Sequence, residues 1–463
     1  MASIGVFTIA SKNYLAYVRV LMASLAKVHP DYRLYLCLAD RIDGYFDPAT
    51  EPYTIVEAEQ LGIPNFGDFA LRYDIMELNT AVKPFMFRWL FDNTDLDAVI
   101  YLDPDIQAFS KFDCLESILR GGASVVLTPH ITQPLEDDKH PNDYNFLQTG
   151  VFNLGFIAIR RCDESLAFID WWGRRLFKHC IVDFQSSLFV DQKWCDLAPC
   201  FLDNIKILRD MGYNIAYWNL AQRKISKAGN GQWLVNKSPL VFFHFSGVNP
   251  SDLHLVSKHQ NRFSWEDIPE AQPLFSAYND ALMQAGWKES SDWPYVFDEM
   301  FGWKQIPRVV RMLYRAVQPQ PADVELGEIA DCIKNICNQP CTDVRAGNEV
   351  RVSQLMFFIY RTRGDLQSIF LLDTAESRKQ FAAWFEQAGP REYDLPPELT
   401  QQHLIQERSD LLLSGKKVTI QAYRIMVVIE RIAIRMAKVL PPGLQKTLKR
   451  FWFTLKSQII RGF

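Results

Sequence analysis

The first half of the chain alternates short apolar runs with longer amphipathic stretches. Apolar runs of four to eight residues predict buried strands, whereas apolar positions recurring every three to four residues predict helices. The predicted helices include residues 13–28 and 80–91. This alternation predicts an α/β fold with a mostly parallel, doubly wound sheet, in which ligands bind at the carboxyl ends of the strands. The predicted strands are residues 4–9, 33–39, 53–56, 98–102, 124–128, 152–159, 213–217 and 240–245.

Strand signals become rare beyond about residue 252. Residues 265–315 and 324–413 carry helical patterns that are interrupted by Pro, Gly and Asn, as at 318–322. We therefore expect three regions, which are an α/β domain (1–255), a mostly helical domain (256–415) and a C-terminal tail (416–463).

The tail has two helical patterns, separated by Pro441-Pro442-Gly443, each with an apolar stripe opposite basic residues. From residue 416 onward there are eleven basic residues and one acidic residue, which give a net charge of +10. Because the whole chain has a net charge of −4, the first 415 residues carry −14. A basic amphipathic helix is typical of a membrane surface contact. The alternatives are packing of the stripe on the helical domain or a second subunit, and attraction of the tail to the acidic body.

The overall composition is that of a globular protein with more than one unit, since 48% of the 463 residues are hydrophobic and 22% are charged. Nine scattered cysteines favour reduced thiols in the cytoplasm. The chain shows no signal-peptide pattern and no apolar run of the ~20 residues that a bilayer span requires. We expect a cytoplasmic protein, or one peripheral at the inner membrane. Because the first half does not interleave Lys and Arg with aromatic residues, nucleic-acid binding is not expected.

The main candidate for chemistry is Asp103-Pro104-Asp105, which directly follows an apolar strand. Two carboxylates at a strand end can face one divalent cation, and such a cation can neutralise charge developing on a departing nucleotide diphosphate. Alone, this pattern is more often a solvated turn. His244 stands in an apolar run before a polar turn, where a lone histidine is usually structural. Beside two carboxylates it would favour Mn²⁺ over Mg²⁺, but spacing does not show that it approaches Asp103.

These pieces, in this order, resemble GT-A glycosyltransferases, most closely the retaining family 8 type, which includes glycogenin and bacterial lipopolysaccharide galactosyl- and glucosyltransferases. Asp103, Asp105 and His244 match the family's metal-binding D-x-D and H-F-x-G motifs. The resemblance covers roughly the first 255 residues and extends to segments 9–14, 149–156 and 191–192. It implies a GT-A (Rossmann-like) nucleotide-sugar-binding sheet and a hexosyltransferase using Mn²⁺ or Mg²⁺. The implied donor is UDP- or GDP-linked, and the implied acceptor is a glycan or lipid-linked molecule in surface polysaccharide synthesis.

The resemblance also implies roles for single residues. Asn153 and Asp191 would hold sugar hydroxyls, and Gln192 would lie at the sugar face opposite the leaving group or next to it. Lys83 is a candidate for the diphosphate, and an exposed helix lysine is the alternative interpretation. Tyr14 would stack on the base, unless it is a helix residue packed on the sheet. The residues implied to contact the nucleotide are Ala10, Ser11, Asn13, Tyr14 and Asp40.

The chain departs from the family pattern in two places. Residues 246–250 lack the lysine that contacts the diphosphate in the family, so Lys83 or another base has to serve. Leu154 stands where the family usually has serine. If configuration is retained, the family's route is front-face displacement, in which the departing phosphate oxygen takes the acceptor's proton and the protein contributes positioning and electrostatics.

Three other functions compete with this interpretation. A catalytically silent GT-A scaffold would use the helical half to recruit partners. A sugar nucleotidyltransferase would share the sheet and the metal, but residues 10–13 lack the glycine-rich loop usual after its first strand. A haloacid-type phosphatase would need Thr two places after Asp105, where Gln107 stands.

Overall fold

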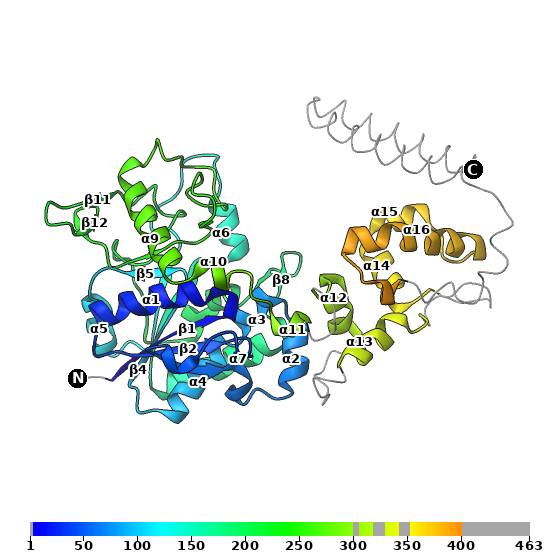
Figure 1. Cartoon of the computed structure of the whole chain (residues 1–463), viewed down its shortest axis with the longest axis horizontal. Coiled ribbons are helices and arrows are strands. Elements are labelled where there is room, and N and C mark those ends of the chain that lie inside the picture. The colour runs from blue at the N-terminus through cyan, green and yellow to red at the C-terminus, as the bar shows by residue number, and fades with distance from the viewer. Residues whose placement is uncertain (1–2, 300–304, 318–328, 342–351, 401–463) are drawn as a thin grey trace. The chain divides into compact units, whose positions relative to one another are not determined.

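The structure is a computed structural model that describes residues 3–299, 305–317, 329–341 and 352–400. The described residues form two compact units, an α/β unit (residues 3–299, 305–306 and 329–330) and a helical unit (residues 307–317, 331–341 and 352–400). In Figure 1 the α/β unit carries the blue-to-green part of the chain, and the helical unit carries the yellow-to-orange part.

A seven-stranded sheet forms the centre of the α/β unit. Its order is β10-β6-β7-β4-β1-β2-β3, and of these strands only β7 runs antiparallel to its neighbours. All seven residues of β1 are buried, as expected for a central strand covered on both faces. The strands are β1 (Ile4–Ala10), β2 (Arg33–Leu38), β3 (Thr54–Glu57), β4 (Ala98–Leu102), β6 (Val125–Pro129), β7 (Phe152–Arg160) and β10 (Ile205–Ile207).

Helices cover both faces of this sheet (Figure 1). Neighbouring residues of β1 point to opposite faces, so Val6 packs in one core with Leu21 of α1, whereas Phe7 packs in the other with Phe87 of α4. The first face is covered by α1 (Leu15–Val28) and α5 (Asp113–Arg120), and the second by α4 (Lys83–Asn93) and α7 (Asp163–His179).

Further short elements complete the α/β unit. Arg19 of α1 donates to the carbonyl of Ala285 at 3.0 Å, two residues before the start of α10. Because α10 packs on α1, the compact unit extends beyond the boundary at residue 255 that the sequence suggested. The remaining elements are η1 (Lys12–Tyr14), α2 (Phe66–Arg72), α3 (Ile75–Ala81), β5 (Ile106–Ala108), α6 (Asp143–Thr149), β8 (Val182–Asp183), β9 (Leu188–Phe189), α8 (Ala198–Phe201), β11 (Ile225–Lys227), β12 (Trp233–Val235), β13 (Ser238–Pro239), β14 (Phe242–His244), α9 (Gln272–Gln284), α10 (Trp287–Ser290) and α11 (Val296–Glu299).

The helical unit is built from short helices around its own apolar interior. Leu355 and Ile359 of one helix and Phe381 and Phe385 of another are fully buried. Ser353 and Thr374 cap two of these helices by accepting backbone N–H groups. The helices are α12 (Arg308–Val317), α13 (Ile329–Asn338), α14 (Gln354–Thr362), α15 (Gly364–Ile369) and α16 (Ala375–Tyr393).

The predicted fold class, an α/β sheet followed by a mostly helical region, is confirmed. The strand predicted at 213–217 is wrong. There only Ile215 forms an isolated bridge, to Phe243, and Asn214 takes a left-handed conformation (φ 52°) that breaks an extended run.

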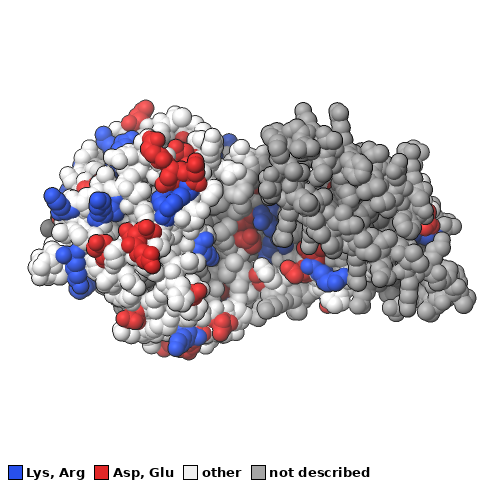
Figure 2. Space-filling model, turned by 90° about the horizontal axis from the view of Figure 1, so that it is seen from above, with Lys and Arg blue, Asp and Glu red and all other residues white. Residues whose placement is uncertain are grey.

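The two helices predicted in the tail lie outside the described residues. None of the helices in the described ranges has the length and apolar character of a transmembrane span. On the face shown in Figure 2, acidic and basic side chains of the α/β unit lie among one another.

Candidate metal and nucleotide site

Two carboxylates lie in the turn between β4 and β5. β4 ends at Leu102, and Ile106, the first residue of β5, donates its N–H to the carbonyl of Asp103 at 3.1 Å. This tight turn places Asp103 and Asp105 together at the carboxyl end of a central strand. The sequence predicts this position correctly, because the apolar run stops where the two acidic residues begin.

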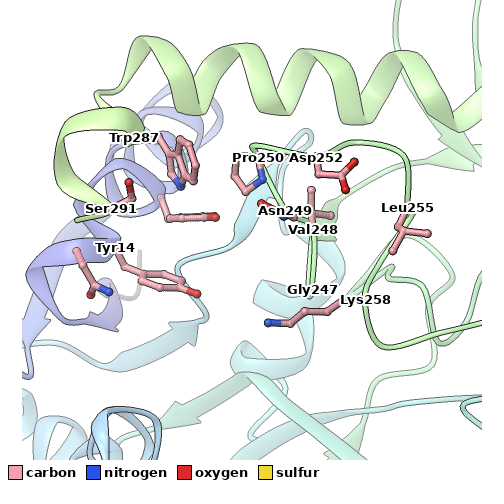
Figure 3. Close-up of a pocket in the computed structure, with 12 residues that line it drawn as sticks. Tyr14, Gly247, Val248, Asn249, Pro250, Asp252, Leu255, Lys258, Trp287 and Ser291 are labelled. Carbon is pink, nitrogen blue, oxygen red and sulfur yellow. The ribbon is translucent and has the colours of Figure 1, made fainter. Parts of the chain in front are cut away.

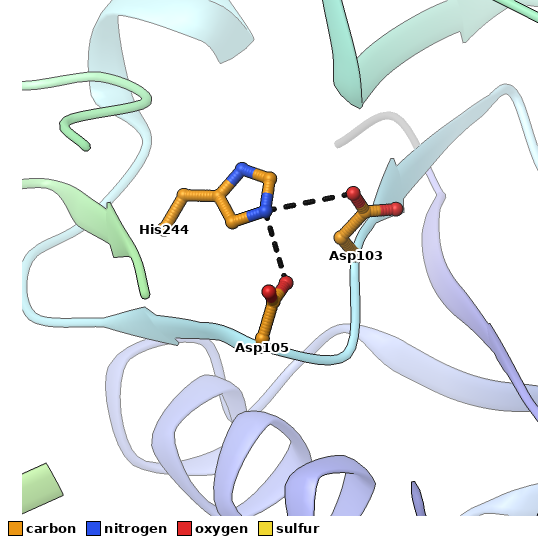
Figure 4. A group of neighbouring side chains, drawn as sticks. All are labelled: Asp103, Asp105 and His244. Atoms are coloured by element: carbon orange, nitrogen blue, oxygen red, sulfur yellow. Dashed lines mark ion pairs between the residues drawn. The ribbon is translucent and has the colours of Figure 1, made fainter. Parts of the chain in front are cut away.

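A second strand brings His244 to the same turn. β14 pairs antiparallel with β5, so that His244 lies opposite Ile106, and Phe245 donates its N–H to the carbonyl of Asp105 at 2.8 Å. The Nε2 atom of His244 lies 2.9 Å from Asp105 Oδ1 and 3.6 Å from Asp103 Oδ2. One ligand atom from each of the three side chains lies within 4.8 Å of the others (Figure 4). His244 therefore does approach Asp103, which the spacing in the sequence does not show.

Gly155 of β7 allows this close approach. A Cβ atom at that position would lie 2.4 Å from Cε1 of His244 and 2.8 Å from Oδ2 of Asp103. The backbone of Gly155 also accepts the N–H of Asp103 at 2.8 Å. Only glycine leaves room for both side chains at this point of the sheet.

The three groups form a negatively charged cluster in which His244 is buried and the two carboxylates are partly exposed. Burial raises the pKa of the Asp103 carboxyl above its ordinary value, against the opposing charges of Lys83 and His244. Burial alone would lower the pKa of His244, but the hydrogen bond and charge of Asp105 outweigh it, and the pKa is raised. Negative charge thus exceeds positive charge here, and two carboxylates with one imidazole suit a divalent cation such as Mn²⁺.

A buried ion pair lies beside the cluster. Lys83 binds Asp191 at 2.5 Å and the carbonyl of Leu154 at 2.9 Å, and its ammonium lies 4.0 Å from the ring centre of Tyr101. The hydroxyl of Tyr101 donates to Asp103, so the pair and the carboxylate cluster are linked through one side chain. Burial raises the pKa of Asp191, while Lys83 opposes that shift. Lys83 is 1% exposed and is not among the residues that line the pocket described below.

Gln192 and Asn153 hold the backbone around this pair. The Gln192 amide accepts the N–H of Leu154 at 3.1 Å and donates to the carbonyl of Thr149 at 3.0 Å. Asn153 accepts the N–H of Gly155 at 3.2 Å, and its Nδ2 lies 3.3 Å from Nε2 of the buried His130. Both amides therefore fix the start of β7, directly beside the cluster.

A pocket of about 330 Å³ lies beside the loop that follows His244 (Figure 3). That loop, residues 247–258, closes on itself because Lys258 donates its N–H to the carbonyl of Gly247 at 3.0 Å. The side chain of Lys258 points into the space between this loop and Tyr14. Burial raises the pKa of Tyr14, and the negative charge of Asp105 raises it further. The charge of Asp105 therefore acts on a residue that lines this pocket. The lining residues are Asn13, Tyr14, Tyr17, Gly247, Val248, Asn249, Pro250, Asp252, Leu255, Lys258, Trp287 and Ser291.

The other residues of the predicted nucleotide loop are placed unevenly. Asn13 and Tyr14 line the pocket, whereas Ala10 and Ser11 are buried and are not among its lining residues. The carboxylate of Asp40 is only 1% exposed and accepts from both the ammonium and the N–H of Lys12, and from the N–H of Val296. Its oxygens therefore tie three segments of the chain together.

Sequence reasoning missed Lys258 and Trp287. Lys258 stands fourteen residues after His244, beyond residues 246–250 where the resemblance places a lysine, and only the closed loop brings it back beside Gly247. Trp287 comes from α10, in a part of the chain assigned to a separate helical domain. An aromatic residue next to Gly286 was the only available signal, and it is a weak one.

No protein-family model matches the chain. The chain is similar to two proteins of Bacillus subtilis (strain 168), both described as uncharacterised. YfnD is 24% identical over 288 residues, which are 60% of this chain and 88% of YfnD. YfnF is 26% identical over 211 residues, which are 44% of this chain and 66% of YfnF.

Three solved structures to which the chain is similar are glycosyltransferases. The galactosyltransferase LgtC, in complex with donor and acceptor sugar analogues, has 16% identity and a TM-score of 0.37 over 62% of this chain and 99% of LgtC. The glycosyltransferase GlyE of Streptococcus pneumoniae TIGR4 has 15% identity and a TM-score of 0.34, over 64% and 66%. The bifunctional glycosyltransferase WbbM has 10% identity and a TM-score of 0.35, over 63% and 50%.

Proposed function

We propose that this protein is a metal-dependent glycosyltransferase of the GT-A type, which moves a sugar from a nucleotide-diphosphate donor to a glycan or lipid-linked acceptor. One observation carries the proposal: Asp103, Asp105 and His244 converge next to a pocket lined by Tyr14 and Lys258. A cation held by carboxylates, an accessible aromatic ring and a lysine are the groups that a nucleotide diphosphate needs for its phosphates and its base.

The donor's charged end would lie at the carboxylate cluster. Asp103, Asp105 and His244 would hold Mn²⁺ or Mg²⁺, which when bound neutralises negative charge on the diphosphate leaving group. In place of Lys83, we assign the second positive charge for the diphosphate to Lys258, because its ammonium points into the pocket whereas that of Lys83 is buried against Asp191. Tyr14 would stack on the base.

The sugar would lie toward β7. There Asn153 would hold a sugar hydroxyl, and Gln192 would lie at the sugar face. The resemblance assigns a sugar hydroxyl to Asp191 as well, but its carboxylate is buried against Lys83, so we assign it the positioning of that lysine instead. The Gln192 amide accepts the N–H of Leu154 and donates to the carbonyl of Thr149, which supports a positioning role for this side chain. The order of the motifs, which is similar to that in family 8, favours a hexosyl donor and transfer with retention. It also favours front-face displacement, in which positioning and electrostatics provide the rate acceleration. We further propose a cytoplasmic role in surface polysaccharide synthesis.

The test is calorimetric titration of a panel of nucleoside diphosphates in the presence of Mn²⁺ or Mg²⁺. We expect metal-dependent binding that Asp105→Asn weakens by at least about tenfold, since a charge-assisted ligand is lost. Asp280→Asn is the matched control, because Asp280 is an exposed carboxylate of α9 outside the cluster.

Two outcomes would contradict the proposal. Equal nucleotide binding by the wild type and Asp105→Asn would remove the carboxylate cluster from the site. An absence of binding for every nucleotide and metal would favour the silent scaffold, because a scaffold has no need of a donor. Thermal unfolding of both variants controls for loss of the fold.

A further inference from the structure

Three aromatic side chains form one continuous wall of the pocket. The ring of Tyr14 stacks on that of Tyr17, with centroids 4.7 Å apart and planes 21° apart. The side chain of Trp287 opposes the rise in the pKa of Tyr17 that burial causes, so these two side chains are neighbours as well. Tyr14 and Tyr17 come from the N-terminal turn and helix, and Trp287 comes from α10, so residues far apart in sequence build the same wall (Figure 3).

Trp287 is held firmly in this place. The residue before it, Gly286, has φ +92°, a conformation that favours glycine, and starts α10 in the required direction. Arg19 fixes the preceding carbonyl of Ala285 at 3.0 Å and is itself paired with Glu51 at 2.6 Å. The position of Trp287 relative to α1 is therefore set by backbone and ionic contacts and does not depend on a bound molecule.

The chemistry of this wall suits a flat heterocycle. Tyr14 is 44% exposed although its ring stacks on Tyr17, and the loop 247–258 contributes Val248, Pro250 and Leu255 to the pocket lining. Flat apolar surfaces on two sides accept the π-face of a base, because stacking requires only a planar ring. The side chain of Lys258 points into the same pocket from the loop 247–258, so one pocket offers both aromatic rings and a positive charge (Figure 3).

We propose that Trp287 is a base-recognition residue of the donor site, forming with Tyr14 and Tyr17 the platform on which the nucleobase stacks. The segment after the strand-rich half is then part of the nucleotide site, and α10 supplies part of the surface that binds the base. This inference rests on the proposed function, since it needs a nucleoside diphosphate in the pocket.

Comparing inorganic pyrophosphate with nucleoside diphosphates separates the contribution of the base to affinity from that of the phosphates. We would measure the affinity of UDP, GDP, ADP and inorganic pyrophosphate, each with Mn²⁺, for the full chain carrying Trp287→Ala, Trp287→Phe or Lys258→Gln. Trp287→Ala should weaken the nucleoside diphosphate that the wild type prefers by about tenfold, the loss expected when one stacking ring is removed. It should leave pyrophosphate within about twofold. Lys258→Gln should weaken both classes.

A second readout is the protein's own fluorescence. Binding of the preferred nucleotide should quench tryptophan emission in the wild type and in the control Trp293→Phe, and the quench should be lost in Trp287→Phe. Trp293 is a suitable control because it packs on Tyr45 and Phe46 and is not among the pocket-lining residues. The phenylalanine variant keeps an aromatic ring, so it remains informative if Trp287→Ala does not fold.

The outcomes are distinct. Equal losses for pyrophosphate and nucleotides in the Trp287 variants, or no change in either, would overturn the base-recognition role while the proposed function stands. If the wild type binds no nucleoside diphosphate with any metal, the proposed function fails and this inference fails with it.

Discussion

At the scale of single residues, the site depends on one glycine whose importance the sequence does not reveal. Replacing Gly155 by Ala would place a methyl group 2.4 Å from a ring carbon of His244 and 2.8 Å from Asp103. We expect Gly155→Ala to lower Mn²⁺ affinity by about ten- to a hundredfold, as when the surroundings of metal ligands are disturbed. Overpacking should also lower the free energy of unfolding by about 1–3 kcal/mol.

Calorimetric Mn²⁺ titration and urea unfolding would measure the two effects. Gly229→Ala is the matched control, because a Cβ there meets nothing within 4 Å. If Gly155→Ala bound Mn²⁺ as tightly as this control, the three side chains would not act as one cation site.

The buried His130 gives a pH dependence at the same scale. Burial lowers the pKa of His130 from 6.5 to about 4, so between these values the unfolded chain binds the extra proton. Stability from this group is therefore present above pH 6.5 and is lost as the pH falls toward 4. We expect a loss of about 2 kcal/mol in the free energy of unfolding between pH 7 and pH 5.

Urea unfolding at both pH values would isolate this effect. In His130→Gln the pH-dependent loss should be smaller than in the wild type by about the same 2 kcal/mol. His254→Gln, at an exposed position, serves as the control and should keep the wild-type dependence. Identical pH dependence in the wild type and His130→Gln would mean that the protonated ring is accommodated in the folded state.

At the scale of elements, the loop 247–258 is the part of the site that depends most on close packing. Gly247 has φ +73°, and a Cβ there would lie 2.4 Å from the Ser257 hydroxyl and 2.5 Å from the His259 ring. Gly247→Ala should therefore open the loop, displace Lys258 and lower nucleoside diphosphate affinity by about tenfold, the loss of one charge-assisted contact.

Gly231→Ala controls for backbone strain alone. Gly231 also has a positive φ, +87°, but a Cβ there meets nothing within 4 Å. Both variants should lose some stability, whereas only Gly247→Ala should lose nucleotide affinity in the calorimetric titration. Equal affinities would show that the loop does not deliver Lys258 to the ligand.

The elements also show what sequence patterns can and cannot predict. The bounds of strands such as β1 and β4 were predicted within about a residue, because a strand that is buried on both faces of a sheet is a continuous apolar run that stops where the strand stops. The pair Asp103 and Asp105 was placed correctly for the same reason. Pairing of β5 with β14, and closure of the loop at Lys258, depend on contacts between distant segments that no local pattern encodes.

At the scale of the whole molecule, the uneven charge remains the clearest guide to a partner. The tail from residue 416 carries +10 and the rest carries −14, and the pattern at 444–463 sets an apolar stripe with Trp452 against Lys446, Lys449 and Lys456. These residues lie outside the described part of the chain, so membrane contact stays a prediction from sequence. Such contact would bring the protein to the surface where lipid-linked acceptors lie.

Vesicle co-sedimentation tests this prediction in two steps. Removing residues 444–463 should abolish binding to vesicles that contain anionic lipid. Replacing Lys446, Lys449 and Lys456 by Gln should lower it by about a hundredfold, at about 1 kcal/mol for each charge near the surface. Added salt should weaken the wild type far more than the Gln variant, because only the charges are screened. Equal sedimentation of the full and shortened chains would instead indicate that the stripe packs on protein.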